Sequence, residues 1–261
     1  MKKLISLVCY TCFFLVFFTS IQAADDKTAF NSEQTAQIET IIHNYLLKNP
    51  QVLLEAAQKL QEQDNAKTNA KIEEIKAKIP KYKNQIFSLT APGRTFIGNP
   101  NAKILLVEVL QYQCSHCQVV EPIVEKLLKA NPDIGLIIMQ WPFFGADAIY
   151  ASKAALAAQK QGKFAELNTA FLSSHELLNA EKIDAIIKSI SGLNVDKLKK
   201  DMQDKSLDDG LKANFKLSQD LGFIGTPTLV FADRALTKFS LLAGQTPDVE
   251  GDLNNALKQV R

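Results

Sequence analysis

Two cysteines three positions apart, Cys114 and Cys117, are the residues of this sequence best placed to do chemistry. The run Cys114-Ser115-His116-Cys117 follows an apolar stretch that is typical of a strand and begins a stretch that is typical of a helix. Free N–H groups and the helix dipole stabilise an anion at a helix N-terminus, and His116 could add a positive charge or a hydrogen bond. Both effects favour a Cys114 thiolate, the nucleophile of disulfide exchange. We expect Cys117, one turn further in, to be shielded and to resolve a mixed disulfide.

Two other roles are open to this cysteine pair. It could form a structural disulfide, although one close pair is not a disulfide framework and a chain of this length should form its core without it. It could be half of a zinc site, but two more ligands would be needed, and His43 and His175 have no recognisable partner spacing. We therefore favour redox chemistry, with no metal and no cofactor beyond the Cys114–Cys117 disulfide.

Residues 1–23 have the order of a secretory signal peptide: a basic start, an apolar run at 4–18, and small residues that end at Ala23. The run is shorter than the about 20 residues of a membrane span, so an uncleaved anchor is the less favoured alternative. Cys9 and Cys12 lie inside this segment and would be removed with it. We predict export to the bacterial periplasm or cell envelope, an oxidising compartment.

The composition excludes two classes of protein. With 46% hydrophobic and 22% charged residues, the chain has ordinary globular composition and is not a disordered protein. Removal of the first 23 residues takes away two of the 30 basic residues, so that the remaining basic charges balance the 28 acidic residues. A strongly basic nucleic-acid binder is therefore disfavoured, and we expect no nucleic-acid partner.

Residues 24–85 show helical patterns only. Asn31 and Gln34 match a capping box, Asn49-Pro50 separates two helical patterns, and Pro80 is expected to end the second one. The apolar stripes are too thin to make a core; they comprise Ile38, Ile41, Ile42, Tyr45, Leu53 and Leu60. These helices could pack on the main domain or on a second copy of themselves. We favour the second copy and predict that residues 24–85 form a homodimerisation region.

Residues 86–261 alternate between strand and helix patterns. Apolar runs at 103–110 and 134–140 enclose a helical pattern at 117–130, which predicts a parallel, right-handed strand–helix–strand unit with buried strands. Turn-forming residues mark positions 92–93 and 98–101.

The rest of the chain completes an α/β domain. Helical patterns alone occupy about 146–222, which predicts a helical insertion. Two apolar segments, 228–231 and 239–243, suit an antiparallel hairpin, and a closing helix is expected at 248–260. The run Gly225-Thr226-Pro227-Thr228 lies directly before the first of these strands, where Pro227 could follow a cis peptide bond or be an ordinary trans turn proline.

The chain resembles the DsbA family of thioredoxin-fold thiol–disulfide oxidoreductases, and within it the oligomeric DsbA-like and ScsC-like branch. The likeness rests on residues 98–103, 106–108, 114–117 and 225–228, and on residues 45–53 for the oligomerisation arm. It implies a thioredoxin-like catalytic domain over 86–261, in which the loop at Pro227 faces the cysteines.

The resemblance also implies roles for single residues. Cys114 would be catalytic and Cys117 resolving, Pro227 would be cis, and Glu108, six residues before Cys114, would be a buried acid that assists proton transfer at the buried sulfur. The sequence departs from the family at Ser115, where proline is common, and at Thr226, where valine is frequent. Both positions help to set redox poise and substrate release.

Motif and resemblance together predict an envelope thiol–disulfide oxidoreductase that forms, and also isomerises, disulfides. Its partners would be exported client proteins with thiols or disulfides, a second copy of the chain, and a membrane quinone-linked redox protein. The alternative is a non-enzymatic envelope binding protein or chaperone, with a structural disulfide on a thioredoxin-like frame. Kappa-type glutathione transferases fit less well, because they need neither a second cysteine nor a signal peptide.

Overall fold

The computed structural model describes residues 30–174, 176–244 and 246–261. The chain divides into two compact units between Glu62 and Gln63. The predicted signal peptide lies outside the described residues. In the part of the chain that is described, no helix is both long and apolar enough to cross a membrane.

The first unit contains α1 (Ser32–Lys48) and the start of α2 (Gln51–Ile86). The predicted capping box is confirmed: the Asn31 side chain accepts a hydrogen bond from the Gln34 backbone N–H at 2.8 Å, and the Gln34 side chain accepts one from the Asn31 N–H at 3.0 Å. No side chain of α1 is buried. Exposed apolar side chains follow both helices: Ile41, Ile42, Tyr45, Leu47, Leu53, Leu54 and Leu60.

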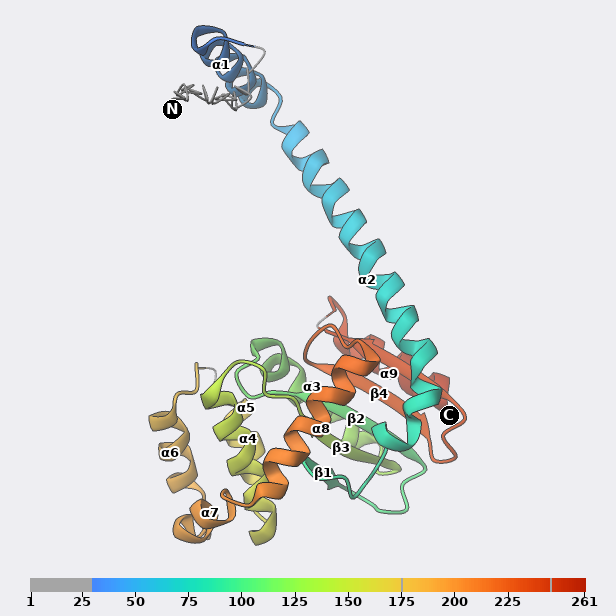
Figure 1. Cartoon of the computed structure of the whole chain (residues 1–261). Coiled ribbons are helices and arrows are strands. Elements are labelled where there is room, and N and C mark those ends of the chain that lie inside the picture. Colours follow the sequence, from blue (N-terminus) through green and yellow to red (C-terminus); the bar gives the residue numbers. More distant parts are fainter. Residues whose placement is uncertain (1–29, 175, 245) are drawn as a thin grey trace, which may run out of the picture. The chain divides into compact units, whose positions relative to one another are not determined.

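The second unit is built on a five-stranded sheet of order β1-β3-β2-β4-β5 in the described residues (Figure 1). The strands are β1 (Arg94–Ile97), β2 (Ile104–Leu110), β3 (Ile134–Gln140), β4 (Thr228–Asp233) and β5 (Phe239–Ala243). β2 and β3 are parallel and joined by α3 (Ser115–Ala130), as predicted, while the other pairs are antiparallel.

Strand β1 was not predicted. It has four residues and lies between Gly93 and Gly98, so that the segment was interpreted as turns. Its stability comes from pairing with the edge of β3, from Arg94 opposite Met139 to Ile97 opposite Leu136. Four residues are too few to show the alternation that predicts a strand from sequence. The pairing with β3 decides that this segment is a strand.

The two faces of the sheet carry separate apolar cores. Side chains of a strand alternate between faces, so Leu106 and Leu110 face α3 and α9 (Val249–Val260) together with the helical insertion. Leu105 and Val107 face the end of α2 and the end of α8. Glu108 occupies the position between Leu106 and Leu110, which places a carboxyl group in the first core.

Helix α2 continues through Pro80, so the prediction that proline ends it was wrong. Proline removes a hydrogen bond inside a helix and costs about 3 kcal/mol. Ile75, Ile79 and Ile86 of the same helix are buried against the sheet, and each such burial is worth about 1.5–3 kcal/mol. This packing outweighs the cost of the proline and joins the second half of α2 to the sheet domain.

Arg94 fixes the end of α2. Its guanidinium donates to the backbone carbonyls of Gln85 and Ile86, the latter at 2.7 Å, and to the Asn214 side chain at 3.1 Å. A cation at a helix C-terminus is favourable because of the helix dipole. Burial lowers the pKa of Arg94 to about 10, which leaves it charged at neutral pH.

Helices occupy the segment between β3 and β4, as predicted for the insertion. They are α4 (Ala146–Ala158), the 3-10 turn η1 (Gln159–Gln161), α5 (Phe164–Leu172), α6 (Ala180–Ser189), α7 (Val195–Asp201) and α8 (Lys205–Leu221).

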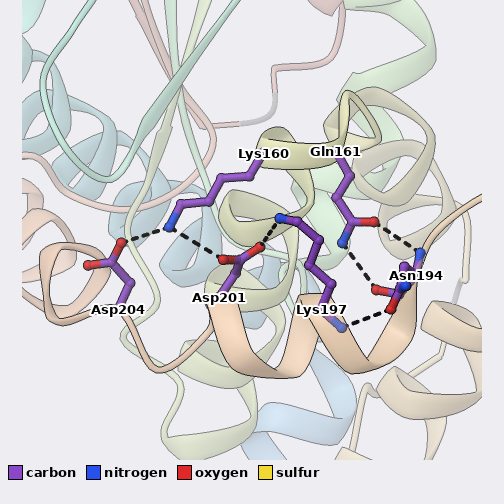
Figure 2. Close-up of polar contacts among 6 residues, drawn as sticks. All are labelled: Lys160, Gln161, Asn194, Lys197, Asp201 and Asp204. Carbon is purple, nitrogen blue, oxygen red and sulfur yellow. Dashed lines mark hydrogen bonds and ion pairs between the residues drawn. The ribbon is translucent and has the colours of Figure 1, made fainter.

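Polar side chains connect η1 to α7 and to the start of α8 (Figure 2). Lys160 lies 2.7 Å from an oxygen of Asp204 and 3.7 Å from Asp201, and Gln161 exchanges two hydrogen bonds with the backbone of Asn194. Exposed ion pairs are worth about 1 kcal/mol or less. These contacts therefore orient the outer helices of the insertion more than they stabilise it.

We expect Ile79→Ala to lower the free energy of unfolding of the protein by about 2–5 kcal/mol, because it removes a fully buried side chain and leaves a cavity. Lys76→Ala, one turn earlier on α2, is the matched control. Its ion pair with Glu73 is exposed, so the change should stay within about 0.5 kcal/mol. Urea denaturation followed by circular dichroism measures both; equal effects would contradict the packing of α2 on the sheet.

Candidate active site

The two cysteines lie at the start of α3, directly beyond the C-terminal end of β2. Cys114 is the N-cap residue of the helix, with extended backbone angles, and Cys117 lies in the first turn. Both are free thiols. Cys114 is 9% exposed and Cys117 is fully buried, while Ser115 and His116 between them are exposed. The predicted difference in shielding between the two sulfurs is therefore present.

The loop before β4 faces the cysteines. The Thr226–Pro227 peptide bond is cis, and the Cys114 thiol donates a hydrogen bond to the Thr226 backbone carbonyl at 3.1 Å. The Thr228 hydroxyl donates to the carbonyl of Gly225 at 2.7 Å, which fixes the turn. The structure thus brings together four residues that the sequence singled out from two distant segments: Cys114, Cys117, Thr226 and Pro227.

The surroundings of Cys114 lower the pKa of its thiol to about 5. The largest cause is hydrogen bonding from the Cys117 thiol to the thiolate, and burial opposes it. The Thr226 hydroxyl has no hydrogen-bond partner among the described residues, so it is free to donate to the thiolate, which lowers the pKa of Cys114 further. Backbone N–H groups of Cys117 and His116 add to this. The contribution expected from the His116 side chain stays a prediction.

Cys117 has the opposite shift. Burial raises the pKa of its thiol well above the usual value, and the neighbouring charges of Cys114 and Glu108 raise it further. Near neutral pH, Cys114 is therefore a thiolate and Cys117 a protonated thiol. This is the division that attack by one sulfur and later resolution by the other requires.

Glu108 is fully buried, as the resemblance implied. Neither oxygen of its carboxyl group has a hydrogen-bond partner among the described residues. Burial raises the pKa of this carboxyl well above its usual range, and the nearby Glu121 raises it further. Because a buried, unpaired carboxylate is very costly, Glu108 carries a proton at neutral pH. Its role in proton transfer stays a prediction.

A buried polar chain beside this site was not predicted. Glu121 accepts a hydrogen bond from Asn168 at 3.3 Å, Tyr112 donates to Asn168 at 3.0 Å, and Gln140 donates to the Tyr112 hydroxyl at 2.7 Å. Ser152 donates to Gln140 at 3.1 Å. The sequence held one indication of this chain, because Glu121 lies on the otherwise apolar face of α3, about one turn after Cys117. The residues of the helical insertion that complete the chain could not be identified from the sequence.

No cluster of three or more histidine, cysteine or acidic residues that could hold a metal ion occurs in the described part of the chain. His175, which was considered as a zinc ligand, lies outside the described residues.

Two family models match the chain. Residues 90–241, more than half of it, match the family described as Thioredoxin. Residues 34–67 match the family described as Copper resistance protein ScsC N-terminal domain. No curated protein matches the sequence.

Several solved structures are similar. The thiol-disulfide exchange protein alpha-DsbA2 from Wolbachia pipientis is 30% identical, with coverage of 72% of this chain and 97% of that protein and a TM-score of 0.62. Proteus mirabilis ScsC in a transitional conformation is 26% identical over 89% and 99%, with a TM-score of 0.59. A thioredoxin-like oxidoreductase from Silicibacter pomeroyi DSS-3 is 28% identical over 67% and 95%, with a TM-score of 0.60.

The chain belongs to the thioredoxin family, as a DsbA-like and ScsC-like member with a thioredoxin-like fold. Its general role is thiol–disulfide exchange, and its class is oxidoreductase.

We expect the reduced protein to show a thiolate titration with a midpoint near pH 5, measured by ultraviolet absorbance and absent in Cys114→Ser. Below this pH the thiol is protonated, so alkylation of Cys114 should slow about tenfold per pH unit. Thr226→Val keeps the shape but removes a donor to the thiolate, and it should raise the midpoint. A wild-type midpoint near 8.5, the value of free cysteine, would contradict the site as described.

Proposed function

We propose that this protein is an exported thiol–disulfide oxidoreductase that forms, and also isomerises, disulfides in client proteins through Cys114 and Cys117. The observation that carries the proposal is the Cys114 sulfur at the N-terminus of α3: it contacts the Thr226 carbonyl and lies beside a buried Cys117 thiol. A reactive thiolate next to a protonated resolving thiol is the arrangement that exchange in both directions needs.

The chemistry runs through a mixed disulfide. In oxidation, a client thiolate attacks Cys114 of the Cys114–Cys117 disulfide, and Cys117 leaves with the electron pair and takes up a proton. A second client thiolate then attacks the client sulfur of the mixed disulfide, and the Cys114 thiolate leaves. In isomerisation, the Cys114 thiolate attacks a client disulfide and is later displaced by another client thiol. The low pKa of Cys114 makes it a good leaving group in both reactions.

The loop before β4 supports binding of an extended client segment. Its backbone lies beside the reactive sulfur, and an extended peptide can pair with exposed backbone groups of such a loop. We place the reaction in the bacterial periplasm or envelope, after removal of residues 1–23. A membrane quinone-linked protein would restore the disulfide after each oxidation.

The first unit supports self-association. Its exposed apolar side chains recur on α1 and on the start of α2, and full burial of each large one is worth about 1.5–3 kcal/mol. We propose that these faces pair in a homodimer, which gives two Cys114 sites to one client. Two sites on one scaffold favour isomerisation, because a client released from one can be recaptured by the other.

Cys117→Ala should trap mixed disulfides between Cys114 and exported proteins, because attack proceeds and resolution does not. Cys114→Ala should trap none, since the remaining thiol is buried and protonated. Non-reducing electrophoresis of envelope extracts, with and without reductant, detects the adducts. Equal amounts of adducts from the two variants would contradict the roles assigned to the two cysteines. The absence of adducts from both variants would favour the non-enzymatic alternative.

Deletion of residues 24–62 should yield a folded monomer, because residues from Gln63 onward form a compact unit of their own. It should still reduce small disulfides but lose most of its activity on a scrambled-disulfide protein. Light scattering of the mature and the shortened protein, beside both activity assays, tests this. A monomeric mature protein would overturn the homodimer, and a shortened protein that keeps full isomerase activity would overturn the role given to self-association.

A further inference from the structure

A cavity of about 340 Å³ lies where the loop between α2 and β1 meets the helical insertion. Three segments of the second unit form its walls: residues 89–94 of the loop and the start of β1, residues from 156–160 at the end of α4 and in η1, and residues 206–207 at the start of α8. This volume is within the range of about 300–1,000 Å³ that is usual for small-molecule sites in proteins.

Arg94 is the buried charged residue among those that line this cavity. Its side chain belongs to a residue that is only 8% exposed. A guanidinium carries five N–H donors, and the structure uses three of them: Nε donates to Asn214, and Nη1 donates to the carbonyls of Gln85 and Ile86. Nη2 has no hydrogen-bond partner among the described residues. Two donors of a buried cation therefore remain for a group in the cavity.

The charge of Arg94 has no counter-ion in the described part of the chain, where this residue forms no ion pair. The carbonyls at the end of α2 supply only part of a negative charge. None of the described residues that line the cavity is acidic. Because a buried cation without a counter-ion is costly, an anion in this cavity would supply a charge that the chain itself does not.

Lys160 adds a second cation at the edge of the cavity, and the acids beside it are neutralised (Figure 2). Its Nζ lies 2.7 Å from an oxygen of Asp204 and 3.7 Å from Asp201. Asp201 also pairs with Lys197 at 2.7 Å, and the other oxygen of Asp204 accepts a hydrogen bond from the Ser206 N–H at 3.0 Å. Two lysines thus balance two aspartates, so this group of charges does not repel an anion near the guanidinium.

The uncharged polar side chains of the cavity are able to donate hydrogen bonds. The Thr95 hydroxyl donates to Oε1 of Gln159 at 3.0 Å, which leaves Nε2 of Gln159 without a partner among the described residues. Thr90 and Ser206 add hydroxyl groups to the lining. Several donors without a competing carboxylate in the walls are what an anion-binding site requires.

Asn214 fixes the position of the guanidinium. Its side-chain oxygen accepts from Arg94 at 3.1 Å, and its nitrogen donates to the carbonyls of Gly93 at 2.7 Å and Gln140 at 3.1 Å. Gly93 has a φ of 75°, and a Cβ there would lie 2.6 Å from a backbone carbon of Gly210, so only glycine lets the loop approach α8 this closely. These contacts hold the donors in place before a ligand binds, which lowers the cost of binding.

We propose that this cavity binds a small oxyanion, through a phosphate, sulfate or carboxylate group that accepts hydrogen bonds from Nη2 of Arg94. Gln159 Nε2 and the hydroxyls of Thr90 and Ser206 complete the contacts. Hydrogen bonds between a guanidinium and such groups are roughly twice as strong as those between neutral groups. The bound anion connects the loop after α2 to the helical insertion. The site is separate from the cysteines, so the inference does not depend on the proposed function.

Isothermal titration calorimetry of the mature protein with potassium phosphate, sodium sulfate and sodium succinate, at constant ionic strength set by chloride, tests the proposal. At least one anion should bind saturably at one site per chain and raise the midpoint of thermal unfolding, because it binds the folded state only. Binding of phosphate or sulfate alone identifies a tetrahedral anion, and binding of succinate alone identifies a carboxylate; either result supports the site. Absence of saturable binding by all three would overturn it.

Gln159→Leu should weaken the affinity about tenfold, because a hydrogen bond to a charged group is lost. Lys160→Gln should also weaken it, since the acids beside the cavity lose a cation. Lys163→Gln is the matched control, because it removes the same charge three residues further along, where Lys163 pairs with Glu166 and does not line the cavity. Equal losses in the two lysine variants would show attraction to general surface charge and would contradict the site.

Arg94→Gln should abolish binding. Because Arg94 also holds the end of α2, a measurement on the wild type covers the case in which this variant fails to fold. In nitrogen-15 NMR, the anion should shift the backbone amide signals of residues 89–94, 159–160 and 206–207, with the dissociation constant that calorimetry gives. Shifts confined to other surfaces, such as the start of α3, would exclude this cavity as the binding site.

Discussion

A 3.1 Å contact between the Cys114 sulfur and the Thr226 carbonyl oxygen, a hydrogen bond when the thiol is protonated, joins two loops that are 112 residues apart in the sequence. It forms because β2 and β4 are neighbours in the sheet, with Val109 opposite Thr228, so that both loops leave the sheet at the same edge. This register places Thr226, whose hydroxyl helps to lower the pKa of Cys114, beside the sulfur. A shift of one residue would turn the side chains of β4 to the other face of the sheet and remove one donor that keeps Cys114 ionised.

The two sulfurs show how distance along one helical turn changes the chemistry of a thiol. At Cys114, the N-cap residue, hydrogen-bond donors stabilise the thiolate more than burial destabilises it, so the pKa of the thiol falls. Cys117, inside the first turn, is fully buried, and its pKa rises. The same core holds Glu108 as a protonated acid. Burial that protects the resolving thiol thus also isolates its proton, and an exchange enzyme needs a path for that proton.

The two halves of α2 differ in how far their apolar side chains are buried. The second half of α2 buries Ile75, Ile79 and Ile86 on the sheet, and Arg94 holds its last carbonyls. The first half of α2 and α1 carry apolar side chains that are exposed in the described part of the chain. One helix therefore has a half that is buried on the sheet and a half that carries exposed apolar side chains.

The sequence alone determined the local features. The strands at 104–110 and 134–140, the capping box at Asn31 and the cysteine pair at a helix start were predictable, because each depends on residues that are near in the sequence. The cis bond before Pro227 and the buried Glu108 were implied by the resemblance, and the structure contains both.

Tertiary structure decided the features that depend on distant partners. Strand β1 exists through its pairing with β3, and α2 passes through Pro80 because the sheet buries the isoleucines around it. Glu121 accepts a hydrogen bond from Asn168 of the helical insertion, 47 residues away in the sequence. The titration of its carboxyl group depends on burial, which no spacing in the sequence can measure, because burial is a property of the packed chain.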